Sequence, residues 1–189
     1  MTKIMQKIIL HVCCAPCSTH SIEELQKDYE VTLFFYNPCI FPEKEYNKRL
    51  ENAEIIAKEM NVKLIAPKYN HQEFIDFIKG LENEKENGAR CLKCFEQRLS
   101  KTAEYASEHG FDFFTTTLTI SPHKNSKKIF EIAENKKGNS KFLEIDFKKK
   151  DGFKKSTELS KKYNLYRQNY CGCEFSLRSS IASPKEKNL

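Results

Sequence analysis

Residues 8–17 read IILHVCCAPC, an apolar run that ends in closely spaced cysteines. The apolar part, Ile8–Val12, predicts a buried strand, and Ser18–Lys27 behind it predicts a helix. A buried strand that leads directly into a helix is the opening of a βαβ unit, which indicates an α/β fold. His11 lies inside the apolar run, and we interpret it as a core residue whose ring is hydrogen-bonded.

The same alternation of strand and helix continues along the chain. Alternating elements predict a single-domain layered fold with a mainly parallel sheet and flanking helices, Rossmann-like and nucleotide-hydrolase-like in topology. A length of 189 residues without repeat or linker suits one domain, so residues 1–189 are expected to form a single catalytic domain. The further predicted strands are Val31–Tyr36, Val62–Ile65, Phe111–Leu118 and Lys141–Ile145. The further predicted helices are Glu43–Met60, His71–Leu81, Cys91–His109, Ser126–Glu134 and Gly152–Tyr163.

Chemically active residues follow several of these predicted strands. Cys13 and Cys14 follow the first strand, Cys39 follows the second, His123 lies beyond Phe111–Leu118, and Asp146 follows the last. In parallel α/β sheets, ligands bind beyond the carboxyl ends of the strands. We therefore expect a cysteine-rich metal site at that edge of the sheet.

The cysteine content is high for a chain of this kind, with eight cysteines in 189 residues. The chain is too large for a disulfide scaffold and has no sign of export, so clustered cysteines indicate metal ligands or redox groups. The cysteines form three groups and one single residue: Cys13-Cys14-Ala15-Pro16-Cys17, Cys91-Leu92-Lys93-Cys94, Cys171-Gly172-Cys173 and Cys39.

An iron–sulfur centre suits these spacings better than zinc. Structural zinc sites use four ligands, commonly from two C-x-x-C knuckles, and would leave several of the seven grouped thiols unused. Iron–sulfur clusters take thiolates from distant segments. A structural zinc site, buried structural cysteines and a thioredoxin-like dithiol remain alternatives. The glycines form neither a dinucleotide fingerprint nor a Walker loop, which favours chemistry by metal and thiol.

Positive charge is concentrated in one segment. The chain has 32 Lys and Arg against 26 Asp and Glu, and residues 121–170 alone hold 14 basic and 6 acidic residues. This segment is either a solvated helix face or a footprint for the phosphates of a nucleic acid. The candidate phosphate-binding residues are Lys148, Lys149, Lys150, Lys154 and Lys155.

Four segments resemble one known family: HVCCAPCS at 11–18, RCLKCFEQRL at 90–99, TTTLTISPHKN at 115–125, and DFKKKDGFKKSTELSKKYNLYRQNYCGCEFS at 146–176. Their order and spacing are similar to those of the epoxyqueuosine reductases of the QueH type, over nearly the whole chain. This resemblance implies a cobalamin-independent oxidoreductase that reduces epoxyqueuosine to queuosine at the wobble position of tRNA, the last step of queuosine biosynthesis. It implies a [4Fe-4S] cluster, with an additional iron as a further possibility, and an electron donor that the sequence does not identify.

The resemblance also implies roles for individual cysteines. By position, Cys171 and Cys173 are either a redox-active pair or ligands of the additional iron. Where the family usually has Asn-Pro-Asn, this chain has Asn-Pro-Cys, and we interpret Cys39 as a neutral change instead of an added thiol near the site. The implied cluster ligands are Cys13, Cys14, Cys91 and Cys94.

Other residues are candidates from their chemistry. Asp146 can complete a metal site or, alternatively, cap the following helix. Tyr166 and Tyr170, with Arg167, can stack on an extruded anticodon base, although tyrosines at such a junction are also ordinary core residues. His123 is a candidate proton donor.

Two other functions fit parts of the sequence. One is an RNA-binding module with a structural zinc, and the other is a different iron–sulfur enzyme of tRNA modification, such as a thiolation enzyme that uses ATP. The N-terminal Met1–Gln6 lacks the apolar block of a signal peptide, and no run approaches the roughly 18 apolar residues of a membrane helix. We expect a cytoplasmic protein without a membrane partner.

Overall fold

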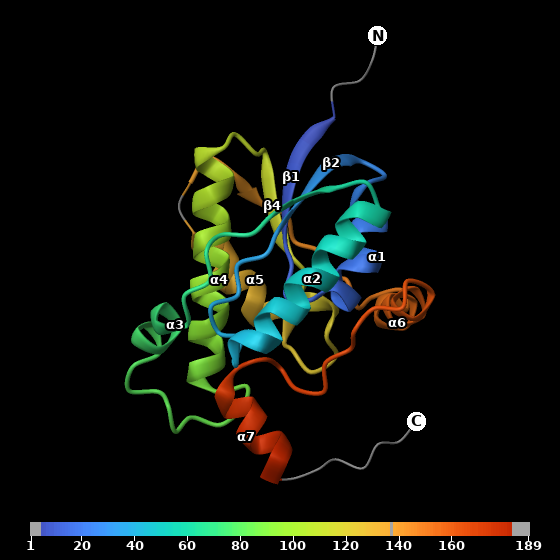
Figure 1. Cartoon of the computed structure of the whole chain (residues 1–189). Coiled ribbons are helices and arrows are strands. Elements are labelled where there is room, and N and C mark those ends of the chain that lie inside the picture. The colour runs from blue at the N-terminus through green and yellow to red at the C-terminus, as the bar shows by residue number, and fades with distance from the viewer. Residues whose placement is uncertain (1–4, 137, 183–189) are drawn as a thin grey trace.

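A five-stranded parallel sheet organises the chain (Figure 1). The computed structural model describes residues 5–136 and 138–182, so residues 1–4 of the N-terminal segment and Lys137 of the basic segment lie outside the described part. The strand order β3-β2-β1-β4-β5 is the doubly wound order of Rossmann-like folds, which confirms the predicted fold class. The strands are β1 (Gln6–His11), β2 (Tyr29–Phe34), β3 (Lys63–Ile65), β4 (Phe113–Thr116) and β5 (Lys141–Phe142).

Helices cover both faces of this sheet (Figure 1). On one face, α1 (Ala15–Leu25) packs against α2 (Glu43–Glu59) and α6 (Gly152–Lys162). On the other face, α4 (Ala89–Glu108) packs against α5 (Ser126–Glu134). Within the described residues, no helix is both long and apolar enough to cross a membrane.

Alternate residues of β1 build the two hydrophobic cores. Ile8 and Leu10 point to the face of α1 and α2, where they join Ile22 and Ile56. Ile9 points to the opposite face and joins a cluster with Leu99 of α4. Successive side chains of a strand point to opposite faces, and a strand covered on both faces is therefore apolar throughout. This explains why IIL appears as an unbroken apolar run.

The fold has a topological switch point between β1 and β4. The chain leaves β1 toward β2 on one side, and β4 pairs with β1 on its other side. Crossover connections leave a crevice at such a point, beyond the carboxyl ends of the two strands. Cys13 and Cys14 follow β1 directly, and Thr117 follows β4, so both segments meet at this crevice.

Several elements differ from the expected ones. The strand predicted over Phe111–Leu118 ends at Thr116, because the Thr116 hydroxyl accepts the Leu118 N–H at 3.1 Å and starts the 3-10 turn η1 (Thr117–Ile120). The last strand spans two residues, although Leu143 N still donates to the Phe114 carbonyl.

Two helices also depart from the prediction. Helix α3 (His71–Phe77) is shorter than predicted, and Gly80 with φ +86° lies in the turn that follows it. Helix α7 (Glu174–Ala182), which follows the C-x-C motif, was not predicted.

Candidate metal centre

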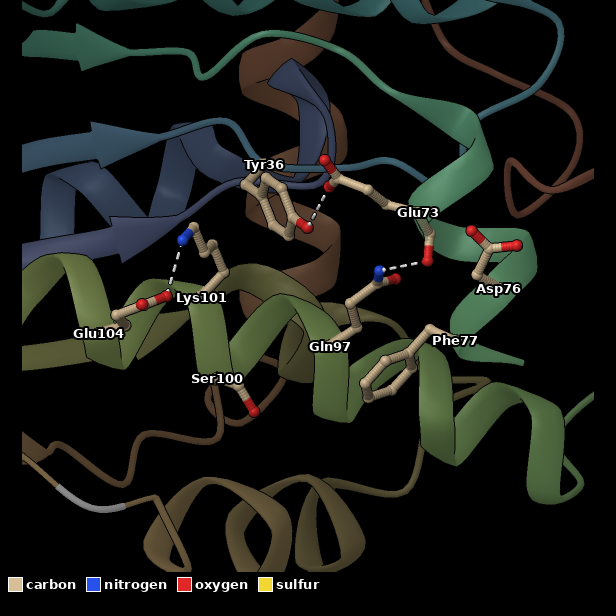
Figure 2. A pocket seen from close by; sticks show the side chains of 8 residues that line it. All are labelled: Tyr36, Glu73, Asp76, Phe77, Gln97, Ser100, Lys101 and Glu104. Carbon is tan, nitrogen blue, oxygen red and sulfur yellow. Dashed lines mark hydrogen bonds and ion pairs between the residues drawn. The ribbon is translucent and has the colours of Figure 1, made fainter. Parts of the chain in front are cut away.

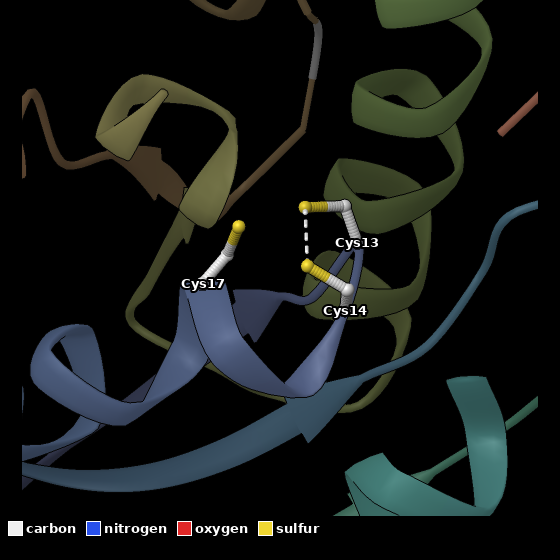
Figure 3. A group of neighbouring side chains, drawn as sticks. All are labelled: Cys13, Cys14 and Cys17. Atoms are coloured by element: carbon white, nitrogen blue, oxygen red, sulfur yellow. Dashed lines mark hydrogen bonds between the residues drawn. The ribbon is translucent and has the colours of Figure 1, made fainter. Parts of the chain in front are cut away.

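Three thiols meet at the switch point. The Sγ atoms of Cys13, Cys14 and Cys17 all lie within 4.8 Å of one another, and Figure 3 shows them facing a common space. Cys13 and Cys14 follow β1, Cys14 has an extended backbone at the start of α1, and Pro16 lies in the first turn of α1, where its missing N–H costs no hydrogen bond. The first turn of α1 then brings Cys17 back toward the pair. Cys17 was not among the predicted ligands, and the structure places its sulfur with those of Cys13 and Cys14.

The triad is arranged around the sulfur of Cys13. The Cys13 and Cys14 sulfurs are 3.9 Å apart, and the Thr117 hydroxyl donates to Cys13 Sγ at 3.5 Å. Hydrogen bonds from the thiols of Cys14 and Cys17 hold the pKa of Cys13 well below its usual range, against the opposing effect of burial. Gln168 Nε2 donates to Cys14 Sγ at 3.0 Å. The triad thus favours one thiolate, at Cys13, the form of cysteine that binds metal. The contact with Cys13 raises the pKa of Cys14 to about 12 and also raises the pKa of Cys17.

A second group of thiols lies between α4 and the loop after β2. The thiols of Cys39 and Cys94 hydrogen-bond to each other, and this contact lowers the pKa of Cys39 to about 6. Cys91 lies one turn earlier on α4, where its sulfur accepts the Asn87 N–H at 3.2 Å. Burial raises the pKa of Cys91. The predicted ligands Cys91 and Cys94 are therefore accompanied by Cys39.

The C-x-C segment lies near both groups of thiols. A charge on Cys171 raises the pKa of Cys91 and of Cys94, in each case after the larger effects of burial and hydrogen bonding. Cys171 itself is exposed, and Cys173 is half-buried with its sulfur 3.6 Å from the Ser176 hydroxyl. Among the described residues, the sulfurs of Cys13, Cys14 and Cys17 form the group that lies within 4.8 Å, and the predicted ligands Cys91 and Cys94 are not part of that group.

The guanidinium of Arg49 anchors the C-x-C turn by hydrogen bonds to its backbone. Its Nη1 donates to the Cys171 carbonyl at 3.0 Å and its Nη2 to the Tyr170 carbonyl at 3.3 Å, while Nε pairs with Glu45 at 2.7 Å. Gly172 has φ +141°, and a Cβ there would come within 3.0 Å of Arg49 Nη1. Glycine is needed at this position both for its backbone angle and for the close approach of the guanidinium.

Two further cations face the sulfur atoms without a carboxylate partner in the described part of the chain. Burial lowers the pKa of Arg98, but thiolate charge at Cys94 and Cys39 outweighs it and leaves this pKa raised. Lys124 is only partly buried. Burial lowers its pKa, but negative charge at Cys171 and Cys13 outweighs this effect and leaves the pKa raised. Buried cations are normally paired with anions. The donor set, sulfur atoms surrounded by cations, therefore fits an anionic thiolate-bound metal centre.

Asp146 and His123 lie outside the contacts of the cysteine sulfurs described above. The Asp146 carboxylate accepts from the Ser126 hydroxyl at 3.0 Å and pairs with Lys148 at 3.0 Å. His123 is exposed in the turn between η1 and α5. The structure therefore does not bring Asp146 onto the cysteine sulfurs, and a catalytic role for either residue stays a prediction.

The predicted tRNA-binding residues divide into two groups. Lys148 is engaged within the protein, because its ammonium contacts Asp146 and Ser126. The aromatic candidates also have partners: the Tyr170 hydroxyl donates to the Phe41 carbonyl, and the Tyr166 hydroxyl donates to Glu45. The exposed candidates are Lys149, Lys150, Lys154, Lys155 and Arg167, the last with one guanidinium contact to Ser160.

A separate groove lies between α3 and α4 (Figure 2). Its volume is about 540 Å³, and the Tyr36 hydroxyl donates to Glu73 at 3.0 Å on one wall. The groove has no cysteine, so it is distinct from the metal centre. Its lining residues are Tyr36, Glu73, Asp76, Phe77, Gln97, Ser100, Lys101 and Glu104.

His11 is buried directly beside the site, as predicted for a core residue. Its Nδ1 lies 2.9 Å from the Thr116 hydroxyl, and burial lowers its pKa to about 4 from an ordinary value of 6.5. The unfolded chain therefore binds the extra proton more readily than the folded one. We expect the free energy of unfolding of the metal-free protein to fall by up to about 3 kcal/mol as the pH drops from 6.5 to 4.

Urea unfolding of wild type and His11→Gln at several pH values measures this effect. His11→Gln is expected to lose most of the pH dependence of the free energy of unfolding. The control His109→Gln, at an exposed histidine, is expected to keep it. Equal pH dependence in wild type and His11→Gln would contradict the assignment.

Comparisons with known proteins agree with this geometry. The family model for epoxyqueuosine reductase QueH matches residues 8–179. The epoxyqueuosine reductase QueH of Streptococcus pyogenes serotype M1 is 40% identical, over 94% of this chain and 75% of its own length. The enzyme of that name from Staphylococcus epidermidis is 41% identical, over 89% of this chain and 75% of its own length.

The fold is also similar to a solved structure, U34-tRNA thiolase NcsA from Methanococcus maripaludis with its [4Fe-4S] cluster. The TM-score is 0.57 at 12% identity, and the match covers 95% of this chain and 64% of that one. At that identity the likeness shows the fold alone. The family match and the curated relatives go further, and they show that the chain belongs to the epoxyqueuosine reductase QueH family.

Proposed function

We propose that this chain reduces epoxyqueuosine to queuosine in tRNA. The observation that carries the proposal is the triad of cysteine sulfurs at the carboxyl edge of the sheet, in a chain that carries four more thiols in its C-x-x-C and C-x-C motifs. A structural zinc site would need only four of these thiols. The remaining thiols indicate chemistry beyond a structural role.

The reaction sets clear requirements. Conversion of an epoxide to an alkene consumes two electrons and two protons, and releases the oxygen as water. The oxygen must gain protons as its bonds to carbon break, and two electrons must reach the carbon atoms. The site therefore needs a source of electrons, a proton donor and a place for the base.

The thiols fit an iron–sulfur centre. Cys13, Cys14, Cys91 and Cys94 would hold a [4Fe-4S] cluster, and Cys17 of the triad would hold it or an additional iron. When bound, such a centre supplies electrons one at a time and a Lewis acid for the epoxide oxygen.

Cys171 and Cys173 fit the role of a redox pair. Oxidation of two thiols to a disulfide releases two electrons and two protons, which balances the reduction of one epoxide. An external electron donor must then reduce the disulfide before the next turnover. Cys171 is exposed and can meet both substrate and donor, while the Arg49 contacts fix the turn that carries it.

Lys124 is a candidate for stabilising negative charge on the epoxide oxygen, while the two thiols of the redox pair supply the protons. Burial lowers the pKa of its ammonium, but negative charge at Cys171 and Cys13 outweighs this effect and leaves the pKa raised. A protonated amine beside the thiols can neutralise the oxygen as its bond to carbon breaks.

Product analysis tests the proposed function. Anaerobically purified protein, with a chemical reductant as electron source, is incubated with tRNA that carries epoxyqueuosine. The tRNA is then digested to nucleosides, which are separated and analysed by mass spectrometry. The expected result is loss of one oxygen atom from the modified base. No conversion by protein that holds iron and sulfide, or a strict need for ATP, would contradict the proposal.

The exposed lysines of the basic segment support tRNA binding. We expect the fourfold variant Lys149→Gln, Lys150→Gln, Lys154→Gln, Lys155→Gln to bind tRNA more weakly and with a flatter salt dependence. Each lost phosphate contact lowers the slope of log affinity against log salt by roughly 0.7. Turnover at saturating tRNA is expected to change little, because phosphate contacts position the substrate without touching the reacting bond.

Binding isotherms at several salt concentrations measure this effect. The matched control neutralises four exposed lysines near the opposite edge of the sheet: Lys7, Lys58, Lys63 and Lys141. Lys148→Gln is kept separate, because that side chain contacts Asp146. Equal slopes for the two fourfold variants would place the tRNA surface elsewhere.

A further inference from the structure

Phe41 is an exposed aromatic residue to which the proposed function gives no role. It lies between β2 and the start of α2, and its side chain is 39% exposed. Removal of a phenyl ring from water is favourable, so an exposed ring beside a reactive group offers a surface for a ligand. A single exposed apolar residue is normal on a protein, and the surroundings of Phe41 distinguish it from one.

Phe41 is fastened to the C-x-C turn through its backbone. Its N–H donates to the Gly172 carbonyl at 2.8 Å, and its carbonyl accepts a hydrogen bond from the Tyr170 hydroxyl. These two contacts lie on either side of Cys171, the exposed thiol of the proposed redox pair. The ring of Phe41 is therefore carried by backbone that is bound directly to the reactive turn.

The ring of Phe41 is also supported by a neighbouring ring. It packs on His71, with the two ring centroids 5.2 Å apart and the planes inclined at 36°. His71 is itself fixed, because its Nδ1 donates to the Pro38 carbonyl at 2.7 Å and its Nε2 lies 2.9 Å from the Glu174 carboxylate. The phenyl ring is thus held in place before a ligand arrives, and a preorganised surface binds at a lower entropic cost.

The two tyrosines that were predicted to stack on a base are less accessible than Phe41. Both are half-buried. The Lys48 ammonium lies 3.6 Å from the centroid of the Tyr166 ring, and the Arg49 guanidinium lies 5.3 Å from the centroid of the Tyr170 ring. A cation of the protein therefore already covers one face of each tyrosine. Phe41 is the better candidate for contact with a base.

We propose that Phe41 is a stacking platform for the unpaired tRNA base that carries the epoxide. This inference rests on the proposed function and names the part of the substrate that this surface binds. Bases of single-stranded RNA are commonly recognised by stacking on aromatic side chains. A flat base stacked on Phe41 would hold the epoxide next to the turn that carries Cys171.

The first test compares Phe41→Leu with Phe41→Tyr and with the control Phe77→Leu. Leucine keeps an apolar side chain but removes the aromatic face, whereas tyrosine keeps that face. Phe77 is 41% exposed and lines the separate groove between α3 and α4. Single-turnover rates are measured over a range of tRNA concentrations, and the iron content and Tm of each protein report on the metal centre and the fold.

We expect Phe41→Leu to raise the tRNA concentration for half-maximal rate by roughly five- to a hundredfold, the effect of losing one stacked base. The maximal rate should change less, and the iron content should stay at the wild-type level. Phe41→Tyr and Phe77→Leu should behave like wild type. A lower Tm of Phe41→Leu with an unchanged dependence on tRNA concentration would make Phe41 a packing residue and overturn the inference.

The second test observes stacking directly, because the chain has no tryptophan. Phe41→Trp introduces a single indole at the proposed platform, and Phe77→Trp introduces one at the control position. A base that stacks on an indole quenches its fluorescence. We expect tRNA that carries epoxyqueuosine to quench Phe41→Trp but not Phe77→Trp. The same tRNA with an abasic wobble nucleotide should leave the fluorescence of Phe41→Trp unchanged.

The outcomes separate this inference from the proposed function. Equal quenching of Phe41→Trp by the abasic tRNA would assign the ring to another base and overturn the inference. Conversion of epoxyqueuosine by wild type without any quenching of Phe41→Trp would also overturn it, and the proposed reaction would stand. Base-dependent quenching without conversion by wild type would support the stacking site and overturn the proposed reaction.

Discussion

Cys13→Ser is expected to lose the iron centre and to lower epoxyqueuosine conversion by more than about a hundredfold. Loss of a partner that only supports a metal ligand typically costs 10–100-fold in metal affinity or activity, and loss of the ligand itself costs more. Cys13 is expected to be the most sensitive position because its sulfur contacts the Cys14 sulfur at 3.9 Å and accepts a hydrogen bond from the Thr117 hydroxyl at 3.5 Å. Iron and sulfide analysis, visible absorption and single-turnover product analysis measure the loss.

The matched control for this prediction is Thr117→Val. It removes the hydroxyl that contacts Cys13 but leaves all three sulfurs of the triad in place. We expect this variant to keep its iron and to show a weaker effect on turnover. A Cys13→Ser protein with a full complement of iron and an unchanged spectrum would refute the assignment of the triad to the metal centre.

Cys171→Ser and Cys173→Ser are each expected to abolish turnover while most of the iron remains bound. One thiol alone cannot form the intramolecular disulfide that releases two electrons. The cluster thiols lie on other segments, so their metal should survive the change. In these two variants the iron content should therefore stay high while product formation is lost, whereas Cys13→Ser should lose both.

Arg49→Gln is the control for the position of the C-x-C turn. It keeps both thiols but removes the charged contacts to the carbonyls of Cys171 and Tyr170. We expect partial turnover and retained iron, with lower thermal stability, because Glu45 loses its buried partner. Loss of iron in Cys171→Ser or Cys173→Ser to the same extent as in Cys13→Ser would make the C-x-C cysteines ligands instead of a redox pair.

Much of the fold follows from local sequence patterns. Buried parallel strands are continuous apolar runs, and VTLFFY and IIL are therefore recognisable without the structure. The place of Cys13 and Cys14 beyond a strand was enough to predict the edge of the sheet where the site lies. The end of β4 was predicted less well, because a threonine favours a strand but can also cap a turn with its hydroxyl.

The charged residues of the site could not be predicted from local sequence patterns. Arg49 occurs among charged residues of α2 and looks like a solvent-exposed helix residue, yet it is 2% exposed. Its burial depends on carbonyls more than a hundred residues away. Arg98 carried a weak signal, since it follows Cys94 by one helical turn and shares its face of α4. Lys124 and Gln168 lay within motifs, but only the folded chain shows which sulfurs they approach.

Helix α7 was missed for a related reason. It has no apolar stripe that would reveal it, and its position is set by contacts with other elements. The guanidinium of Arg90 lies over the Phe175 ring at 4.4 Å, and Glu174 pairs with His71 at 2.9 Å. Tertiary contacts of this kind override local propensity.

The anchoring of the C-x-C turn by Arg49 has a consequence for the folding of the protein. The buried guanidinium obtains its carbonyl partners only after Tyr170 and Cys171 have been made, more than a hundred residues later than Arg49 itself. Until then its described charged partner is Glu45, from the same helix. The C-x-C turn and helix α2 therefore gain their fixed relative position in a single late step of folding.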